Sequence, residues 1–172
     1  MDLLPRDKKF ILLDRDGTIN VERKDYVKSY DEFIFLDGAI KALQFLMEKE
    51  FKIILITNQS VVGREIISDS DLKIIHERMV NNLLKEGVII HDIFYCPSAP
   101  KDNSFNRKPN PGMIIEASKK HGFECSKTYF IGDTETDMIA GKRAGCKTLK
   151  LDNNDLLSAC HKLFGEATYE EI

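Results

Sequence analysis

The sequence predicts an α/β protein with a doubly wound, mostly parallel, Rossmann-like sheet. Short apolar segments alternate along the chain with segments of helical spacing, which is typical of βαβ units joined by right-handed crossovers. The apolar segments are continuous rather than alternating, as in strands that are buried on both faces of a parallel sheet. Ligands of such sheets bind outside the carboxyl ends of the strands, so the residues that follow each strand are the candidates for a functional site.

Turn and capping residues place five strands and five helices along the chain. Strands are expected at residues 10–13, 51–57, 88–94, 128–133 and 146–151. Helices are expected at residues 38–47, 68–86, 110–121, 134–144 and 155–164. Residues 21–36 and 95–109 are predicted as loops, with a short extended piece near residues 33–36, and the acidic tail after residue 164 is expected to be loose.

The totals favour one ordinary globular domain over residues 1–172, since no repeat or linker divides the chain. A net charge of -3 gives no basic field for nucleic acid. No apolar run approaches the length of a membrane span, and the N-terminus lacks the apolar core of a signal peptide. The four scattered cysteines form no CxxC pair and are expected to be reduced. We therefore expect a monomeric cytoplasmic enzyme or binding domain without nucleic-acid or membrane partners.

The stretch from Phe10 to Asn20 is the strongest candidate for a functional site. Four apolar residues lead directly into Asp14, Arg15, Asp16 and Gly17, and two carboxylates two residues apart can lie on the same side of an extended chain. A capped turn is the simpler explanation for Asp and Gly residues. Thr57 and Asp133, however, also follow apolar strands, so the three strand ends are expected to converge on one crevice.

The residues expected in this crevice suit phosphoryl transfer. Carboxylates of Asp14, Asp16, Asp133 and Asp137 are hard oxygen ligands of the kind that Mg²⁺ prefers. Thr57 and Asn58 offer donors to phosphate oxygens, and Lys108 or Arg107 offers positive charge. An aspartate can attack phosphorus, and a second carboxylate can protonate the leaving oxygen and then activate water.

Four segments in order resemble the motifs of the haloacid dehalogenase superfamily of phosphatases. They are Asp14-Arg-Asp-Gly-Thr-Ile-Asn20, Thr57-Asn-Gln-Ser60, Arg107-Lys-Pro109 and Gly132-Asp-Thr-Glu-Thr-Asp-Met138. Within that superfamily the segments are similar to those of the D-glycero-D-manno-heptose 1,7-bisphosphate 7-phosphatases and the histidinol-phosphatase domains. The resemblance implies a hydrolase of carbohydrate metabolism that contributes to lipopolysaccharide or nucleotide-sugar precursors and acts on a small phosphorylated sugar.

The resemblance also implies a role for each matching residue. Asp14 would be the nucleophile and Asp16 the general acid and base, while Thr57 and Lys108 would bind the transferred phosphoryl group. Mg²⁺ would be held by Asp14, the backbone carbonyl of Asp16 and Asp133, with Asp137 orienting the metal shell. The remaining matching positions imply substrate binding by Asn20, Asn58, Gln59, Ser60, Arg107 and Thr134.

Simpler explanations exist for some of these residues. Arg107 and Lys108 could be solvated surface charges, and Asp137 could be a first-turn helix acid, a role that does not exclude the functional one. The four histidines, His76, His91, His121 and His161, show no partner pattern, and we assign them no chemistry.

The chain differs from many members of the superfamily in three respects: the cap domain, the zinc loop and the residue at position 134. Only 42 residues separate Asp14 from Thr57 and 50 separate Thr57 from Lys108, which leaves no room for a cap domain over the site. An open site walled by residues 21–30 and 96–107 is therefore expected. The heptose phosphatases often carry a zinc loop, but here only Cys96 remains.

Three of the expected zinc-ligand positions hold Ser98, Ser104 and Asn106, which are poor zinc ligands, so we expect no structural zinc. Pro97, Pro100 and an inward-packing Phe105 are expected to order this loop instead. Thr134 stands where a substrate-binding lysine is common.

Three other functions are weighed against a heptose bisphosphatase. Histidinol phosphate or another small metabolite could be the substrate, whereas a polynucleotide 3′-phosphatase lacks the necessary basic surface. A receiver-like phosphoacceptor domain also uses acids, a Thr and a Lys on a doubly wound sheet, but the order of Asp14 and Asp16 before Gly17 argues against it. A catalytically silent binding module is disfavoured because every expected catalytic side chain is present.

Overall fold

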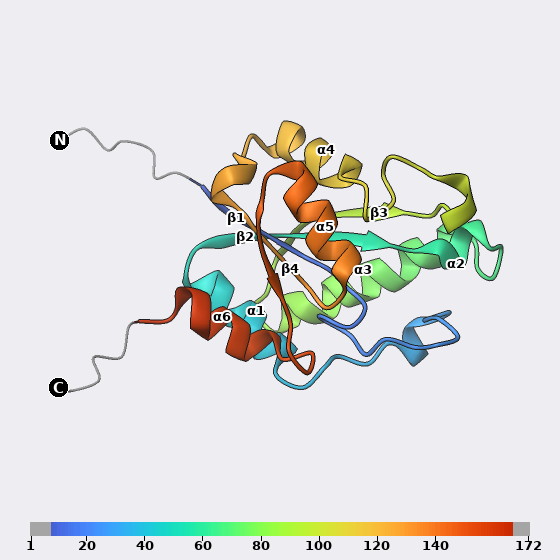
Figure 1. Ribbon diagram of the computed structural model, residues 1–172. Coiled ribbons are helices and arrows are strands. Elements are labelled where there is room, and N and C mark those ends of the chain that lie inside the picture. Colours follow the sequence, from blue (N-terminus) through green and yellow to red (C-terminus); the bar gives the residue numbers. More distant parts are fainter. Residues whose placement is uncertain (1–7, 167–172) are drawn as a thin grey trace.

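The computed structural model describes residues 8–166, and these form a parallel five-stranded sheet with helices on both faces (Figure 1). The strand order is β3-β2-β1-β4-β5, and every neighbouring pair is parallel. The strands are β1 (Lys9–Leu13), β2 (Phe51–Asn58), β3 (Ile90–Cys96), β4 (Tyr129–Gly132) and β5 (Lys147–Lys150). The predicted fold class is confirmed.

The central strand β1 explains why the first apolar segment does not alternate. The strand is buried on both faces from residue 10 to residue 13, because Ile11 and Leu13 belong to one apolar cluster and Phe10 and Leu12 to the other. The first cluster includes residues of the helices α1 (Ala39–Glu48), α3 (Asp69–Lys85) and α6 (Leu156–Phe164). The second includes residues of α4 (Gly112–His121) and α5 (Glu135–Ala144). Figure 1 shows these two groups of helices on opposite sides of the sheet. The site therefore rests on a strand that is fixed from both sides.

The predicted helices are all present, and a short one is added. The helices are α1 (Ala39–Glu48), α2 (Ser60–Gly63), α3 (Asp69–Lys85), α4 (Gly112–His121), α5 (Glu135–Ala144) and α6 (Leu156–Phe164). The Ser68 hydroxyl accepts the Asp71 N–H while the Asp71 carboxylate accepts the Ser68 N–H, so the predicted cap of α3 is a capping box. Gly122 ends α4 in the left-handed conformation with φ of 73°.

The element boundaries agree with the prediction to within about two residues, and the clearest differences lie at the third strand and after β2. The third strand begins at Ile90 rather than residue 88, because Val88 is buried in the core before the chain joins the sheet. Residues 60–63 form α2, a helix that the sequence did not predict because one helical turn is too short to show a hydrophobic periodicity. Three single-turn 3₁₀ helices, η1 (Tyr30–Glu32), η2 (Pro100–Asp102) and η3 (Cys125–Lys127), also interrupt predicted loops and turns.

The connections between strands contain no inserted domain within residues 8–166. The segment from β1 to β2 holds a loop, η1 and α1, and the segment from β2 to β3 holds α2 and α3. None of the helices in this part of the chain is both long and apolar enough to cross a bilayer. The acidic tail lies mostly outside the described residues.

Candidate active site

A cavity of about 360 Å³ opens at the carboxyl ends of β1, β2 and β4. The three strand ends that the sequence predicted to converge do meet here, because Asp14 follows β1, Asn58 ends β2 and Asp133 follows β4. The predicted site residues that line the cavity are Asp14, Asp16, Asn58, Gln59, Ser60, Arg107, Lys108, Asp133, Thr134 and Asp137.

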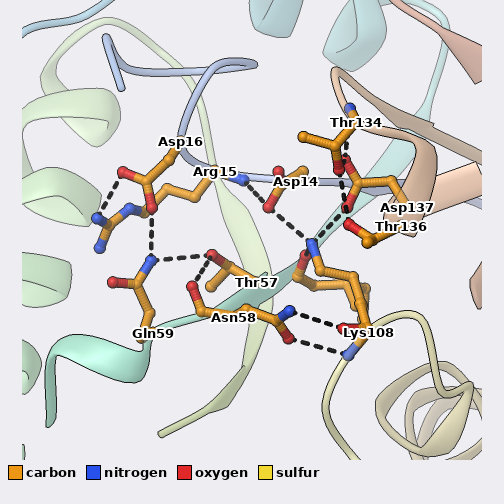
Figure 2. A network of polar contacts seen from close by, with 11 residues as sticks. Asp14, Arg15, Asp16, Thr57, Asn58, Gln59, Lys108, Thr134, Thr136 and Asp137 are labelled. Carbon is orange, nitrogen blue, oxygen red and sulfur yellow. Dashed lines mark hydrogen bonds and ion pairs between the residues drawn. The ribbon is translucent and has the colours of Figure 1, made fainter. Parts of the chain in front are cut away.

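The first of two polar networks joins Asp14, Lys108 and Asp137 (Figure 2). The Lys108 ammonium donates to Asp14 Oδ1 at 2.9 Å and to the Ile56 carbonyl at 2.8 Å, and it pairs with Asp137 Oδ1 at 2.7 Å. The Arg15 backbone N–H also donates to Asp14 Oδ1, at 2.8 Å. Lys108 is 4% exposed, so it is a buried partner of two carboxylates rather than a solvated surface charge.

Burial controls the protonation of this network. It raises the pKa of Asp14 well above its usual value, against the opposing charge of Lys108 and with a further contribution from the charge of Asp137. Burial alone would lower the pKa of Lys108, but the two carboxylates outweigh it and the pKa is raised. The lysine therefore stays charged, while ionisation of both Asp14 and Asp137 would exceed the negative charge that this one lysine can compensate.

The acidic residues of this network fit a divalent cation. Asp14, Asp133 and Asp137 each offer an oxygen within 4.8 Å of the others. Asp133 Oδ1 is buried without a hydrogen-bond partner, and burial followed by the charge of Asp137 raises the pKa of Asp133 to about 6. A hard cation bound by carboxylate oxygens would satisfy both the unpaired oxygen and the excess negative charge.

Gly17 is required for this close approach. A Cβ atom at Gly17 would lie 2.0 Å from Asp133 Oδ2, and the residue has a φ of 78°, which L side chains rarely adopt. The turn after β1 can therefore pass against Asp133 only as glycine.

The second polar network surrounds Asp16 and uses both of its carboxylate oxygens. Arg15 and Asn20 donate to Asp16 Oδ1 at 2.8 and 2.9 Å, and Gln59 donates to Asp16 Oδ2 at 2.7 Å. Burial would raise the pKa of Asp16, but the Arg15 charge and these hydrogen bonds together lower it. Figure 2 shows the Asp16 carboxylate directed to Arg15 and Gln59, whereas Asp14 faces Lys108.

Two predicted residues lie behind the cavity rather than in its lining. Thr57 is 1% exposed, and its hydroxyl accepts a hydrogen bond from Gln59 at 2.9 Å. Asn20 is fully buried and donates to Asp16 and to the Val21 carbonyl. In this arrangement both residues support the residues that line the site.

Asn58 and Thr134 line the cavity but also anchor the chain. Asn58 accepts the Lys108 backbone N–H and donates to the Lys108 carbonyl, both at 3.0 Å, so one amide side chain fixes the segment that carries the lysine. The backbone N–H and the hydroxyl of Thr134 both donate to Asp137 Oδ2, which holds the first turn of α5. Asp137 thus has the helix-capping role that the sequence suggested and also a place in the polar network.

The walls of the cavity match the prediction on one side only. Glu22, Arg23, Lys24, Tyr26 and Val27 line it from the predicted wall at residues 21–30. Residues 96–107 contribute only Arg107, whose guanidinium donates to the Ser98 carbonyl at 3.0 Å. Ser60 at the start of the unpredicted helix α2 and Arg64 directly after that helix also line the cavity.

The loop that replaces the zinc loop is ordered differently from the prediction. Phe105 was expected to pack inward, but it is 61% exposed and its ring lies over the backbone of Gly112, where a Cβ atom would come 2.8 Å from Phe105 Cδ1. Hydrogen bonds order the segment instead, from Asn110 to the Ser104 carbonyl and from the Ala99 N–H to Asp102. Cys96 lies in the apolar core.

Two buried residues of this region were missed by the sequence analysis. Arg15 is 1% exposed, although it lies between two catalytic candidates and was not assigned a role. His76 on α3 is 6% exposed and contacts the Arg15 guanidinium. The helical spacing that places Ile75 and Met79 in the core also predicts burial of their neighbour His76, but only the tertiary structure shows its partner.

Comparison with known families agrees with this geometry. A model of the haloacid dehalogenase-like hydrolases matches residues 6–145. The chain belongs to the haloacid dehalogenase-like hydrolases. The family resemblance drawn from the four motifs is therefore confirmed, and the family is one of enzymes.

Several phosphatases of this family are similar to the chain. The D-glycero-beta-D-manno-heptose-1,7-bisphosphate 7-phosphatase of Helicobacter pylori strain J99 is 38% identical over 151 residues, covering 87% of this chain and 83% of the relative. The D-glycero-D-manno-heptose-1,7-bisphosphate 7-phosphatase of Chlorobaculum tepidum is 36% identical over 180 residues, covering 95% of this chain and 90% of the relative. The relatives thus share nearly the whole length.

A solved structure of this hydrolase family extends the agreement to three dimensions. The D,D-heptose 1,7-bisphosphate phosphatase from B. bronchiseptica, complexed with magnesium and phosphate, has a TM-score of 0.88 to this structure. It is 31% identical and covers 92% of this chain and 99% of its own.

Proposed function

We propose that this protein is a Mg²⁺-dependent phosphomonoesterase that removes the 7-phosphate of D-glycero-D-manno-heptose 1,7-bisphosphate through an aspartyl-phosphate intermediate. The observation that carries the proposal is the environment of Asp14 at the end of the central strand. One carboxylate oxygen of Asp14 is held by the Arg15 N–H and the Lys108 ammonium, so the other oxygen can attack phosphorus.

The reaction needs two steps that reuse the same residues. In the first, an Asp14 oxygen forms a bond to phosphorus, the bond from phosphorus to the sugar oxygen breaks, and Asp16 gives its proton to that oxygen. In the second, water attacks the acyl phosphate, Asp16 takes a proton from the water, and inorganic phosphate leaves Asp14 as a free carboxylate. Lys108 stays charged throughout and offsets negative charge beside Asp14.

The hydrogen bonds around Asp16 favour its carboxylate, which is the form that takes the proton from water. The first step requires the protonated form. A phosphate dianion in the cavity would raise the pKa of Asp16, because like charges disfavour the charged form. Substrate binding would thus favour the protonated form of Asp16, which the hydrogen bonds of the substrate-free site disfavour.

A magnesium ion fits the same cavity. Asp14, Asp133 and the backbone carbonyl of Asp16 would hold it, and Asp137 would orient the surrounding ligands. When bound, the ion offsets the charge of the carboxylates and polarises a phosphoryl oxygen. The unpaired Asp133 oxygen and the raised pKa of Asp133 support this assignment.

The proposed substrate rests on the relatives and on the charge of the rim. The similar phosphatases of H. pylori and C. tepidum are named for heptose 1,7-bisphosphate. Beyond Lys108 and Arg15, which pair with the site carboxylates, four cationic residues line the cavity, namely Arg23, Lys24, Arg64 and Arg107. One phosphate needs the charge near Asp14, and the outer cations suit a second phosphate on the same small molecule.

The proposal includes the organisation of the protein. Residues 1–172 would act as a single capless domain, and as a cytoplasmic monomer that supplies precursors for lipopolysaccharide or nucleotide sugars. The short connections after β1 and β2 support an open site. Sedimentation analysis tests the monomer, and a dimer at micromolar concentration would contradict it.

The proposal keeps magnesium as the metal cofactor and excludes structural zinc. Loop 96–107 offers one thiol, Cys96, whereas structural zinc takes four Cys or His ligands. We therefore expect protein purified without chelator to contain less than about 0.1 zinc per chain. Elemental analysis is the measurement, and about one tightly held zinc per chain would contradict the prediction.

Phosphate release from a panel of substrates tests the function. We expect D-glycero-D-manno-heptose 1,7-bisphosphate to give a kcat/KM at least about a hundredfold above that of histidinol phosphate or other sugar phosphates. A preference for histidinol phosphate would overturn the substrate assignment. Stable phosphorylation of the protein without turnover would favour the receiver-like alternative, and no phosphorylation or release at all would favour a binding module.

A further inference from the structure

A buried Arg–His contact lies behind Asp16, outside the groups that the proposed mechanism uses. Arg15 Nη1 lies 3.0 Å from His76 Nε2, while Arg15 Nη2 donates to Asp16 Oδ1 at 2.8 Å. His76 comes from α3, 61 residues along the chain from Arg15. One guanidinium thus links a helix of the scaffold to the proposed acid and base.

The chemistry of the contact fixes the state of His76. A guanidinium has only donors, so His76 Nε2 must accept, and the ring must be neutral with its proton on Nδ1. A protonated ring would place two cations 3.0 Å apart in a buried site. In agreement, burial, followed by the charge of Arg15, lowers the pKa of His76 to about 3.

The surroundings hold both side chains in place. The Arg15 guanidinium lies 5.7 Å from the centre of the Phe33 ring, and the His76 ring meets the Tyr95 ring edge-on at 5.7 Å. The Tyr95 hydroxyl donates to Asp69 Oδ1 at 2.7 Å, near the start of α3. The Arg15 Nε–H is already buried without a partner, so losing His76 would leave a second guanidinium donor unsatisfied.

We propose that His76 is a positioning residue for catalysis, whose neutral ring holds Arg15 so that Arg15 holds the Asp16 carboxylate in its working orientation. The inference rests on the proposed function, because it assigns to Asp16 the proton transfers described there. Asn20 and Gln59 fix the other directions around Asp16. Without the His76 acceptor, Arg15 would move toward other acceptors and Asp16 would lose its strongest partner.

A histidine that only fills the core would behave differently. Such a residue could be replaced by any ring of similar shape at a cost in stability alone. A positioning role predicts instead that replacing the acceptor atom lowers activity. The loss should be larger for a substrate whose leaving oxygen must be protonated than for one whose leaving group departs as an anion. An alkoxide leaving group depends strongly on a general acid, whereas 4-nitrophenolate needs little protonation.

The test compares two variants on two substrates with Mg²⁺ present. His76→Phe keeps a ring and removes the acceptor, while His76→Gln retains an acceptor near the position of Nε2. We expect His76→Phe to lower kcat/KM about tenfold for the sugar phosphate and less than about threefold for 4-nitrophenyl phosphate. His76→Gln should retain at least about half of the wild-type value on both substrates. His161→Phe, at an exposed position on α6, is the matched control.

Each outcome decides the inference. Equal losses on the two substrates, or no loss in His76→Phe, would overturn it, as would a His76→Gln variant as impaired as His76→Phe. If His76→Phe does not fold, nitrogen NMR of the wild-type imidazoles still tests the contact. A neutral Nδ1–H tautomer for His76 at pH 6 is expected, and a charged ring or an Nε2–H tautomer would overturn it. Absence of turnover in the wild type would instead defeat the proposed function.

Discussion

Asp14 and Asp16 are two carboxylates two residues apart, and the structure gives them opposite environments. Asp14 is buried beside Asp137 as well as Lys108, and burial raises its pKa. Asp16 is only partly buried, and the Arg15 charge together with hydrogen bonds from Arg15, Asn20 and Gln59 lowers its pKa. The difference between them arises from their partners, since the residue type is the same and both residues follow β1 directly.

The comparison shows how one short segment can supply two chemical roles. Pairs of titratable groups whose environments separate their pKa values commonly divide acid, base and nucleophile functions. Figure 2 shows Asp14 directed to Lys108 and Asp16 directed to Arg15 and Gln59, although both carboxylates line the same cavity. Because the two carboxylates have different hydrogen-bond partners, the orientation and pKa of each can be set independently of the other.

The largest expected effect comes from replacing Asp14, the proposed nucleophile. Asp14→Asn should lower phosphate release by about 10⁴-fold or more, because an amide is a far poorer nucleophile and a poorer metal ligand. Initial rates and thermal unfolding of the purified variant measure the effect and the fold. Asp31→Asn, at an exposed position, serves as the control. Retention of a tenth of wild-type turnover by folded Asp14→Asn would show that the nucleophile is misassigned.

Removing the metal should have the next largest effect. Chelation by EDTA followed by dialysis should lower turnover by about 10³-fold, and Mg²⁺ should restore it, because uncompensated carboxylates repel the phosphate dianion. Full activity in metal-free buffer, verified by elemental analysis, is incompatible with the proposed mechanism.

Replacing Asp16, the proposed acid and base, should give a smaller loss of activity. Asp16→Asn should lower kcat/KM for the sugar phosphate by about a hundredfold, because proton transfer to the leaving oxygen is lost while Asp14 remains intact. Burst kinetics should show that the variant still forms some acyl phosphate from 4-nitrophenyl phosphate. An unchanged rate and pH profile would refute the acid–base assignment.

The smallest expected effect is on stability and its pH dependence. Burial raises the folded-state pKa of Asp133 from 3.8 to about 6, so in metal-free protein the folded state binds a proton that the unfolded state releases. The contribution of Asp133 to the free energy of unfolding should therefore fall as pH rises from about 4 to about 7, by about 1–2 kcal/mol after allowance for its partial exposure.

Chemical unfolding of the wild type and Asp133→Asn at several pH values measures this contribution as a difference. Without metal, the free energy of unfolding of the wild type relative to that of the variant should fall as pH rises. Mg²⁺ should restore this difference in stability at pH 7. A difference independent of both pH and Mg²⁺ would show that Asp133 is neither strained nor a ligand.

The sequence by itself determined the scaffold and the meeting of its strand ends. Continuous apolar runs allow only strands buried on both faces, and parallel strands place their carboxyl ends at one edge, so Asp14, Thr57 and Asp133 had to converge. Local signals at Ser68 and Gly122 also fixed helix ends, because capping depends on residues close together in the chain.

Only the tertiary structure decided which side chains line the cavity and which support it. Thr57 and Asn20 lie behind the cavity, Arg64 lines it directly after a helix too short to show periodicity, and His76 contacts Arg15 from a distant helix. Local sequence patterns do not predict such contacts, because the residues that form them lie far apart in the chain. The register of α3 on the sheet and the packing around Arg15 select them, since a buried guanidinium takes whichever acceptor the fold brings within reach.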